Sequence, residues 1–135
     1  MELISRAHLT WKRQVARELA PHGLNPKQIF VLRKLVETGG LAPSEIASLT
    51  FADRPTATSM IGTLERAGFL KRRRDPENAK WVIVEISALG RKKLDSVPQN
   101  LWRSGRTAFD PEGCFTREER AELLRLLEKL NQWLP

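Results

Sequence analysis

The sequence predicts a mainly α-helical fold of the α+β class, and three observations support this prediction. Helical patterns separated by short turns run from about residue 25 to Gly68. Two short segments rich in β-forming residues, joined by a polar turn, follow at once. Apolar stripes at helical spacing occupy both ends of the chain. Together these features predict a winged helix-turn-helix with a helical dimerisation region made from the N- and C-terminal helices.

The chain of 135 residues suits a single domain. We assign residues 1–135 to it, with the winged helix at about 25–87 and the dimerisation helices at about 3–20 and 88–134. The formal net charge of +7 favours an anionic partner. Residues 54–93 carry most of this charge, with ten Lys and Arg against four Asp and Glu. Such a local excess suits phosphate neutralisation, with a solvated basic face as the alternative at this stage.

Composition also disfavours several classes of protein. Cys114 is the only cysteine, so we expect no intrachain disulfide and a reducing cytoplasm, while a redox-sensing role stays open. The first residues lack the apolar run of a signal peptide, and no window approaches a membrane span. His8 and His22 have no ligand cluster near them, so no metal or other cofactor is expected. The absence of a nucleophile-base pair or phosphate loop argues against an enzyme.

The first expected helix covers about residues 3–20. Its apolar side chains recur every three or four residues and comprise Ile4, His8, Trp11, Val15 and Leu19. Arginines lie on the opposite side, and Pro21-His22-Gly23 ends the pattern. We expect His8 to be a packed or interfacial side chain, with contact to a ligand as the alternative.

The second expected helix has clear start and stop signals. Asn25 is a suitable cap, Pro26 fits the first helical position, and Gln28 is placed to complete a capping box. Gly39 and Gly40 then end the helix. Its expected core face comprises Ile29, Leu32, Leu35 and Val36, and Phe30 also suits a core.

A short third helix should begin near Pro43, with apolar side chains at Ile46, Ala47 and Leu49. Residues 50–52 form a tight turn into the next helix. This spacing suits a helix-turn-helix, in which the second helix enters the major groove of DNA while the first braces it.

The fourth expected helix begins at Asp53, whose carboxylate can accept a hydrogen bond from the first backbone amides, and ends at Gly68. Its apolar side should comprise Met60, Ile61, Leu64 and Ala67, with Phe69 beyond. The side chains expected to face a DNA groove are Arg54, Thr56, Thr58, Ser59 and Thr63. Gly62 costs this helix about 1 kcal/mol relative to alanine, and we favour a structural reason for it over close approach to DNA.

Residues 69–74 and 81–86 predict two strands joined by the turn Asp75–Lys80. A hairpin directly after a helix-turn-helix is a wing, whose tip can lie along the DNA backbone or enter the minor groove. The basic side chains that we expect to contact DNA there are Arg72, Arg73, Arg74 and Lys80.

The last part of the chain predicts two helices. Ser87 should cap the first, which carries Leu89, Leu94, Val97 and Leu101, and Pro98 should kink it. Thr116 and Glu119 form a capping box for the second. That last helix has more apolar surface than one neighbour would cover, so we expect a second subunit to cover the rest. The expected dimer contacts are Ile4, Trp11, Leu123, Leu127, Leu130 and Trp133.

Three segments carry a resemblance that spans nearly the whole chain: GLNPKQIFVLRKLVETGGLAPSEIA, then DRPTATSMIGTLERAGFLKRRRDPENAK, then VIVEISALGRKKL. In order and spacing they resemble the MarR family of bacterial and archaeal transcriptional regulators. The resemblance implies a homodimer joined by its terminal helices, and a repressor released by small phenolic or other ligands or by cysteine oxidation.

The resemblance also implies roles for individual residues. Ser44 falls at the start of the supporting helix, which contacts phosphate, and Arg72 matches the basic residue that enters the wing. A small aromatic or phenolic effector would lie near His8, Trp11, Phe30 and Trp102, although these side chains also suit an ordinary core. The chain departs from the family at Asn78-Ala79-Lys80, where Asp, any residue, Arg is usual, and at Ala42, where a Ser or Thr cap is common.

These observations lead to two hypotheses of different classes. The first is a homodimeric, sequence-specific regulator of transcription that binds double-stranded DNA at a pseudo-palindromic operator, with repression as the expected effect. The alternative is a winged-helix protein-interaction module without specific DNA binding. Strong affinity for an acidic protein, without retardation of any DNA, would favour the alternative.

Overall fold

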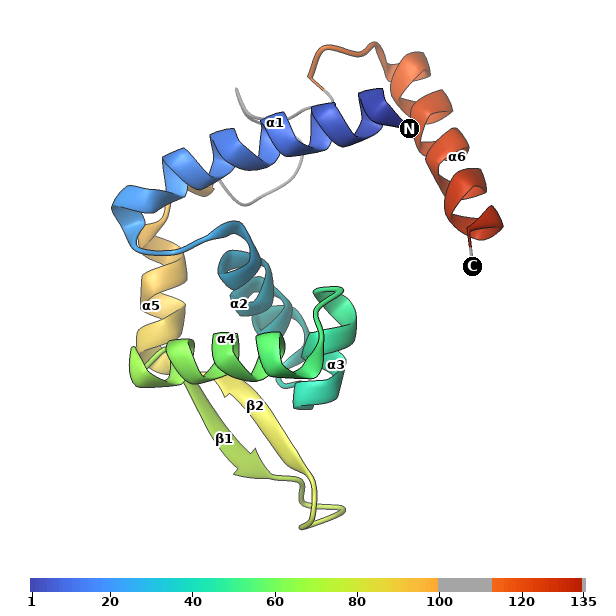
Figure 1. The fold of residues 1–135 in the computed structure, drawn as a ribbon. Helices are drawn as coiled ribbons and strands as arrows, with labels where there is room; N and C mark the ends of the chain where they lie inside the picture. The colour runs from blue at the N-terminus through green and yellow to red at the C-terminus, as the bar shows by residue number, and fades with distance from the viewer. Residues whose placement is uncertain (100–112, 135) are drawn as a thin grey trace.

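The computed structural model describes residues 1–99 and 113–134 and has the mainly helical winged helix-turn-helix that the sequence predicts. Figure 1 shows α1 crossing one end of the winged helix, with the hairpin projecting from the opposite end. The elements in chain order are α1 (Glu2–Leu19), a 3₁₀ helix (Ala20–His22), α2 (Pro26–Thr38), α3 (Pro43–Leu49), α4 (Arg54–Arg66), β1 (Leu70–Arg74), β2 (Val82–Ile86), α5 (Ala88–Ser96) and α6 (Arg117–Trp133).

The predicted signals at both ends of α2 are confirmed. Asn25 Oδ1 accepts a hydrogen bond from the amide of Gln28, and Gln28 Oε1 accepts one from the amide of Asn25, each at 2.9 Å. These two bonds satisfy amides that the helix itself leaves unpaired. Gly39 ends α2 with a φ of +80°, which favours glycine. Local chemistry therefore fixes the length of α2.

The hydrophobic core joins all the elements of the winged helix to the C-terminal end of α1. Its fully buried side chains are Leu19, Leu32, Leu35, Ile46, Ile61, Leu64, Val84 and Val97. Val31 and Ala57 are also buried, although the sequence analysis did not expect them there. Val36, Leu49 and Ala67 were expected in the core but are exposed. Val36 and Leu49 lie in the last turn of α2 and of α3, and Ala67 follows the last residue of α4.

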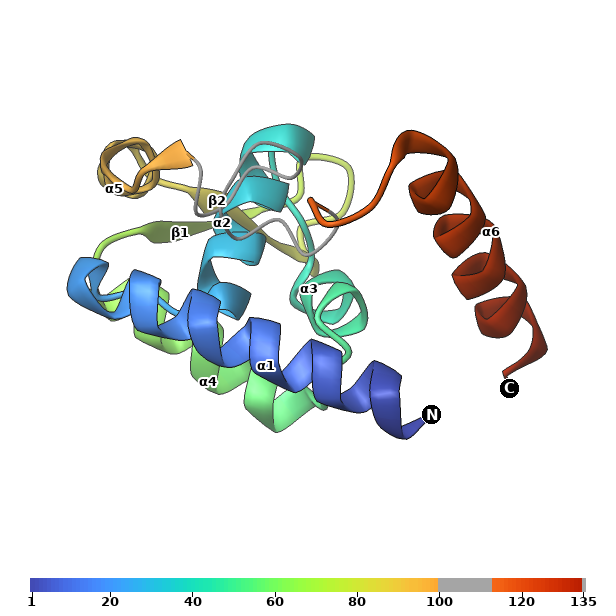
Figure 2. The same cartoon turned by 90° about the horizontal axis from the view of Figure 1, so that it is seen from above.

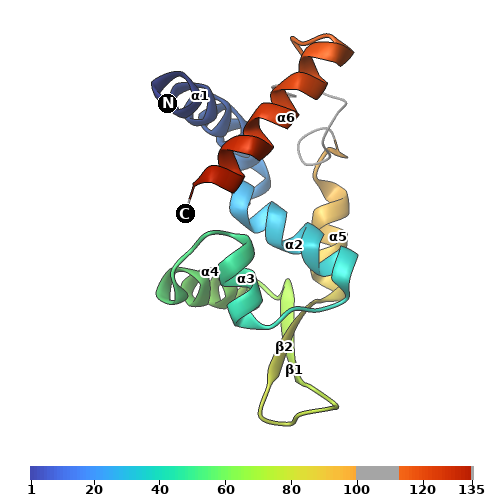
Figure 3. The same cartoon turned by 90° about the vertical axis from the view of Figure 1, so that its right-hand side faces the viewer.

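The wing is an antiparallel hairpin whose register runs from Leu70 opposite Ile86 to Arg74 opposite Val82. The chain between α2 and α3 joins it, because Leu41 and Val84 exchange two backbone hydrogen bonds of 3.0 and 2.8 Å. Figure 3 shows the far end of the hairpin standing clear of the helices. The root of the wing is thus held by the helix-turn-helix, while its tip is exposed.

The predicted kink at Pro98 is wrong, because α5 ends at Ser96 and does not continue through the proline. Val97 has an extended ψ of 129°, which is the conformation that a following proline favours. Ser87 caps the start of α5 as expected, accepting a hydrogen bond from the amide of Gly90 at 2.9 Å. Leu89 is exposed, and Leu101 lies outside the described residues.

Helix α6 begins at the predicted capping box, in which Thr116 and Glu119 accept hydrogen bonds from each other's amides. None of its side chains is buried. Figures 1 and 2 show α6 standing away from the winged helix, beyond the N-terminal end of α1. The apolar side of α6 is therefore still available for contact.

Candidate nucleic-acid interface

Asp53 fixes the start of α4. Its Oδ1 accepts a hydrogen bond from the backbone amide of Thr56 at 2.7 Å, and Pro55 occupies the first turn, where no amide is needed. Hydrogen bonding to the side chain and then to the amide of Thr56 holds the pKa of Asp53 below its ordinary value. The carboxylate also lies at the positive end of the helix dipole, which favours its charged form.

We expect the contribution of Asp53 to stability to depend on pH. Its pKa is lowered in the folded state, so the stabilisation is fully present above the ordinary pKa of an aspartate. It should be lost as the pH falls through the folded value. Thermal melts of the wild type and of Asp53→Asn across the acidic range measure this, because asparagine keeps a capping oxygen but does not titrate. An identical pH profile for both proteins would contradict the assignment.

The two sides of α4 differ sharply. Ala57, Ile61 and Leu64 are buried in the core. The side chains predicted to face DNA are all exposed, namely Arg54, Thr56, Thr58, Ser59 and Thr63. The outward side therefore consists mainly of short polar groups that can approach base edges closely.

Helix α3 begins without a side-chain cap, as the alanine at position 42 requires. The carboxylate of Glu45 accepts a hydrogen bond from the amide of Ala42 at 2.6 Å, so one half of a capping box is formed. Ser44 lies in the first turn with its side chain exposed. The amides in the first turn of a helix favour an anion, which suits the phosphate contact expected of Ser44.

Three ion pairs with two carboxylates order the basic hairpin. Arg72 meets Glu65 of α4 through two parallel hydrogen bonds, with Nε at 2.5 Å and Nη2 at 3.1 Å from the two carboxylate oxygens. Arg73 pairs with Glu85 across the hairpin, and Lys71 lies 3.6 Å from the same carboxylate. Glu65 raises the pKa of Arg72, while Arg73 lowers the pKa of Glu85. Part of the positive charge expected to face DNA is therefore neutralised within the chain.

Short polar side chains shape the tip of the wing. The amide of Glu77 donates to Asp75 Oδ1 at 2.9 Å, and the amide of Lys80 donates to Asn78 Oδ1 at 3.2 Å. The guanidinium of Arg74 donates to the carbonyl of Ala79 at 3.2 Å. Asn78 thus supplies an oxygen acceptor for the turn without a carboxylate.

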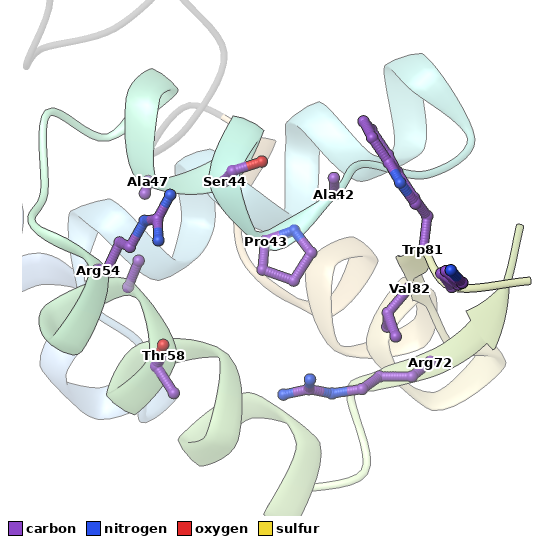
Figure 4. Close-up of a pocket in the computed structure, with 11 residues that line it drawn as sticks. Ala42, Pro43, Ser44, Ala47, Arg54, Thr58, Arg72, Trp81 and Val82 are labelled. Atoms are coloured by element: carbon purple, nitrogen blue, oxygen red, sulfur yellow. The ribbon is translucent and has the colours of Figure 1, made fainter. Parts of the chain in front are cut away.

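An open hollow of about 500 Å³ lies between the N-terminal ends of α3 and α4 and the wing, where Arg72 and residues 80–82 line it. Figure 4 shows Arg54 and Thr58 of α4, Ser44 of α3 and Arg72 of β1 around it. Lys80 also lines it, so five of the predicted DNA-contacting residues come together here. The others, which do not line it, are Thr56, Ser59, Thr63, Arg73 and Arg74.

Sequence reasoning missed two exposed residues at this surface. Trp81 lines the hollow with 58% of its surface exposed, and its place next to Lys80 at the start of a strand was the available signal. Arg66 is exposed on the last turn of α4, where its guanidinium donates to Thr63 Oγ1 at 3.3 Å. Its spacing of three residues from Thr63 places both side chains on one side of a helix.

The residues suggested for an effector are only partly brought together. The rings of His8 and Trp11 lie on α1 with centroids 6.3 Å apart. Phe30 lies on α2 beneath Arg33 and Lys34, whose charged groups are 5.7 and 5.9 Å from its ring centre. Trp102 lies outside the described residues.

The residues expected at a dimer interface remain accessible in the single chain. Ile4 and Trp11 of α1 are 45% and 38% exposed, and Trp133 of α6 is 81% exposed. The three leucines expected beside Trp133 are partly buried, namely Leu123, Leu127 and Leu130. Two terminal helices therefore present apolar side chains to solvent.

Residues 1–99 and 113–134 contain neither a metal-binding cluster nor a membrane-spanning helix. No group of three or more His, Cys, Asp or Glu side chains is arranged to hold a metal ion. No helix there is long and apolar enough to cross a membrane.

Comparisons with known proteins agree on one family. The family model described as "MarR family" matches residues 24–82. The uncharacterized HTH-type transcriptional regulator YkoM of Bacillus subtilis (strain 168) is 30% identical over 128 residues, which cover 94% of this chain and 80% of that protein.

Two solved structures share the fold. One is a cysteine-to-serine mutant of MarR from E. coli complexed with operator DNA, with a TM-score of 0.81 and 23% identity over 99% of this chain and 92% of that one. The other is the transcriptional repressor CouR bound to a 23-mer DNA duplex, with a TM-score of 0.78 and 26% identity over 96% of this chain and 89% of that one.

Proposed function

The chain belongs to the MarR family of transcriptional regulators, and from this premise we propose that it binds operator DNA in a sequence-specific manner as a homodimer. The observation that carries the proposal is the hollow between α3, α4 and the wing, where Ser44, Arg54, Thr58, Arg72 and Lys80 converge. Family membership also agrees with the expectation that the chain is not an enzyme, because this family consists of regulators.

The exposed side of α4 supports a major-groove role. Its short polar residues allow the helix to lie close to base edges, and Thr58 and Ser59 are the candidates for base contact. Ser44 at the start of α3 and Arg54 at the start of α4 would contact phosphates on either side of the groove. Lys80 extends the basic surface to the wing. Arg73 and Arg74, which also lie on the wing, remain predicted contacts to the DNA backbone.

Pairing of two chains through α1 and α6 would hold two DNA-binding surfaces, one from each subunit, at a fixed distance. The exposed apolar residues of both helices support this arrangement, because burying them would remove apolar surface from water. Two α4 helices in successive major grooves would lie about 34 to 36 Å apart, so the operator should be pseudo-palindromic. A dimer on such a site would block transcription by covering the DNA, and repression is the proposed effect.

Release by a small aromatic or phenolic effector is the proposed regulation. His8 and Trp11 lie on α1, which belongs to the proposed dimer region, and Phe30 lies on α2 of the winged helix. A ligand held there would couple dimer geometry to the spacing of the two α4 helices. Adding phenolic compounds to a preformed complex with DNA tests this, and an unchanged affinity across the panel would count against it.

We expect binding to the chain's own upstream DNA to weaken steeply with salt. Each phosphate neutralised by a basic side chain contributes about −0.9 to the slope of log affinity against log salt. Fluorescence anisotropy with labelled DNA at four salt concentrations measures this slope. A scrambled duplex of the same composition is the control for sequence specificity. A flat response to salt, or binding only to an acidic protein, would contradict the proposed function.

A further inference from the structure

Gly62 lies in the middle of α4, where a glycine costs about 1 kcal/mol relative to alanine. Its φ is not positive, so the backbone there does not require glycine. The core does not require it either, because a Cβ at this position would meet a single neighbouring atom within 4 Å, Nη1 of Arg66 at 3.3 Å. The structural reason for Gly62 that the sequence favoured is therefore not found among the described residues. The absent side chain instead leaves space for the guanidinium of Arg66.

Arg66 reaches back along α4 toward the missing side chain. Long side chains on a helix point toward its N-terminus, and the guanidinium of Arg66 lies beside the turn that contains Gly62 and Thr63. Nη2 donates to Thr63 Oγ1 at 3.3 Å, and that hydroxyl in turn donates to the carbonyl of Ser59 at 2.9 Å. Because the proton of Thr63 is engaged by Ser59, its oxygen is free to accept from Arg66. These hydrogen bonds hold the guanidinium of Arg66 about one helical turn nearer the start of α4 than the backbone of Arg66 itself.

Arg66 differs in this respect from the arginines of the wing. Arg72 and Arg73 are held by the carboxylates of Glu65 and Glu85, and Arg74 donates to a backbone carbonyl. In the described part of the chain no carboxylate lies within ion-pair distance of Arg66. Its guanidinium can therefore take an acidic or acceptor-rich partner without breaking an ion pair of the fold.

We propose that Arg66 is the guanine-reading side chain of α4, in a role that rests on the DNA binding proposed above. A guanidinium can donate two parallel hydrogen bonds to O6 and N7 of guanine, which no short side chain on α4 can do. Gly62 leaves room for the guanidinium between the helix and the base edges. Thr63, predicted as a DNA contact, acts here by positioning Arg66.

The test begins with selection of bound duplexes from random DNA by the wild-type protein. We expect one G·C pair in each half-site whose replacement by A·T weakens binding about fivefold or more. Arg66→Ala should bind the selected site and the replaced site equally, while preferences at the other positions remain. Gly62→Ala should reduce the same preference, because its methyl group displaces the guanidinium without disturbing the core. Arg17→Ala, an exposed arginine of α1, is the matched control and should leave all preferences unchanged.

Three outcomes separate the inference from the function on which it rests. If Arg66→Ala weakens binding to every sequence equally, Arg66 contacts phosphate and the proposed role is wrong. If the variant selects the same sites as the wild type, Arg66 reads no base and the role is again wrong, while the function stands. If the wild-type protein selects no DNA, the function and the role of Arg66 fall together.

Discussion

Replacing Gly90 with alanine is expected to destabilise the winged helix by about 3 kcal/mol, at the upper end of the usual cost of overpacking. A Cβ at this position would lie 2.2 Å from the carbonyl oxygen of Phe69 and 2.8 Å from Cγ1 of Ile86. The carbonyl of Phe69 cannot move away freely, because it accepts a 2.9 Å hydrogen bond from the amide of Ser87. The overlap must instead push α5 off the hairpin, and urea denaturation followed by circular dichroism measures the loss.

A second glycine of the same chain provides the control. Gly62→Ala adds the same methyl group where only the flexible end of Arg66 lies nearby, so it should raise the stability by about 1 kcal/mol. The two variants should therefore change the free energy of unfolding in opposite directions, although the chemical change is identical. Equal stability of Gly90→Ala and the wild type would show that α5 does not lie as close to Phe69 as described.

Replacing Leu127 with glutamate is expected to give a monomer that binds operator DNA on the order of 100-fold more weakly. Leu127 lies on the apolar side of α6, and a charge buried between two subunits is strongly unfavourable. Loss of the proposed dimer would remove the effective concentration that links its two DNA-binding surfaces, which is the reason for the size of the effect. Light scattering after size-exclusion chromatography gives the mass in solution, and anisotropy gives the affinity.

The matched control for Leu127→Glu is Gln132→Glu, which adds the same charge on the opposite side of α6. It should leave both the dimer and the affinity for DNA intact. Both variants should retain wild-type helical content, because none of the side chains of α6 is buried in the single chain. A dimeric Leu127→Glu protein with unchanged affinity would assign the subunit interface to another surface.

The sequence predicts those parts of the fold that depend on neighbours along the chain. The caps at Asn25, Asp53, Ser87 and Thr116 involve groups at most three residues apart, so their spacing alone identifies them. The run of β-branched residues likewise predicts β2 itself. The resemblance in three long segments predicts the order of the elements for the same reason, since each segment carries its own caps and turns.

Contacts between elements were beyond the reach of the sequence. The sequence predicted DNA contacts for the arginines of β1 but not their ion pairs, in which Arg72 and Arg73 meet different carboxylates, those of Glu65 and Glu85. The prediction of buried residues failed near helix ends, as at Val36 and Leu49. The periodicity of a sequence does not reveal how far a neighbouring element extends. The end of α5 depended on the effect of Pro98 on the residue before it, which outweighed the helical pattern.

The pairing of Glu65 with Arg72 bears on attempts to give this regulator a new target by exchanging segments with a relative. The carboxylate belongs to α4 and the guanidinium to β1, so a graft of residues 54–66 alone would deliver only one partner of the contact. An unmatched donor segment would leave a charge without its counterpart at the root of the wing and would change the angle between helix and hairpin. The smallest exchangeable cassette therefore runs from the cap of α4 through β1, and chimeras cut between residues 66 and 70 should lose affinity even for the donor's own site.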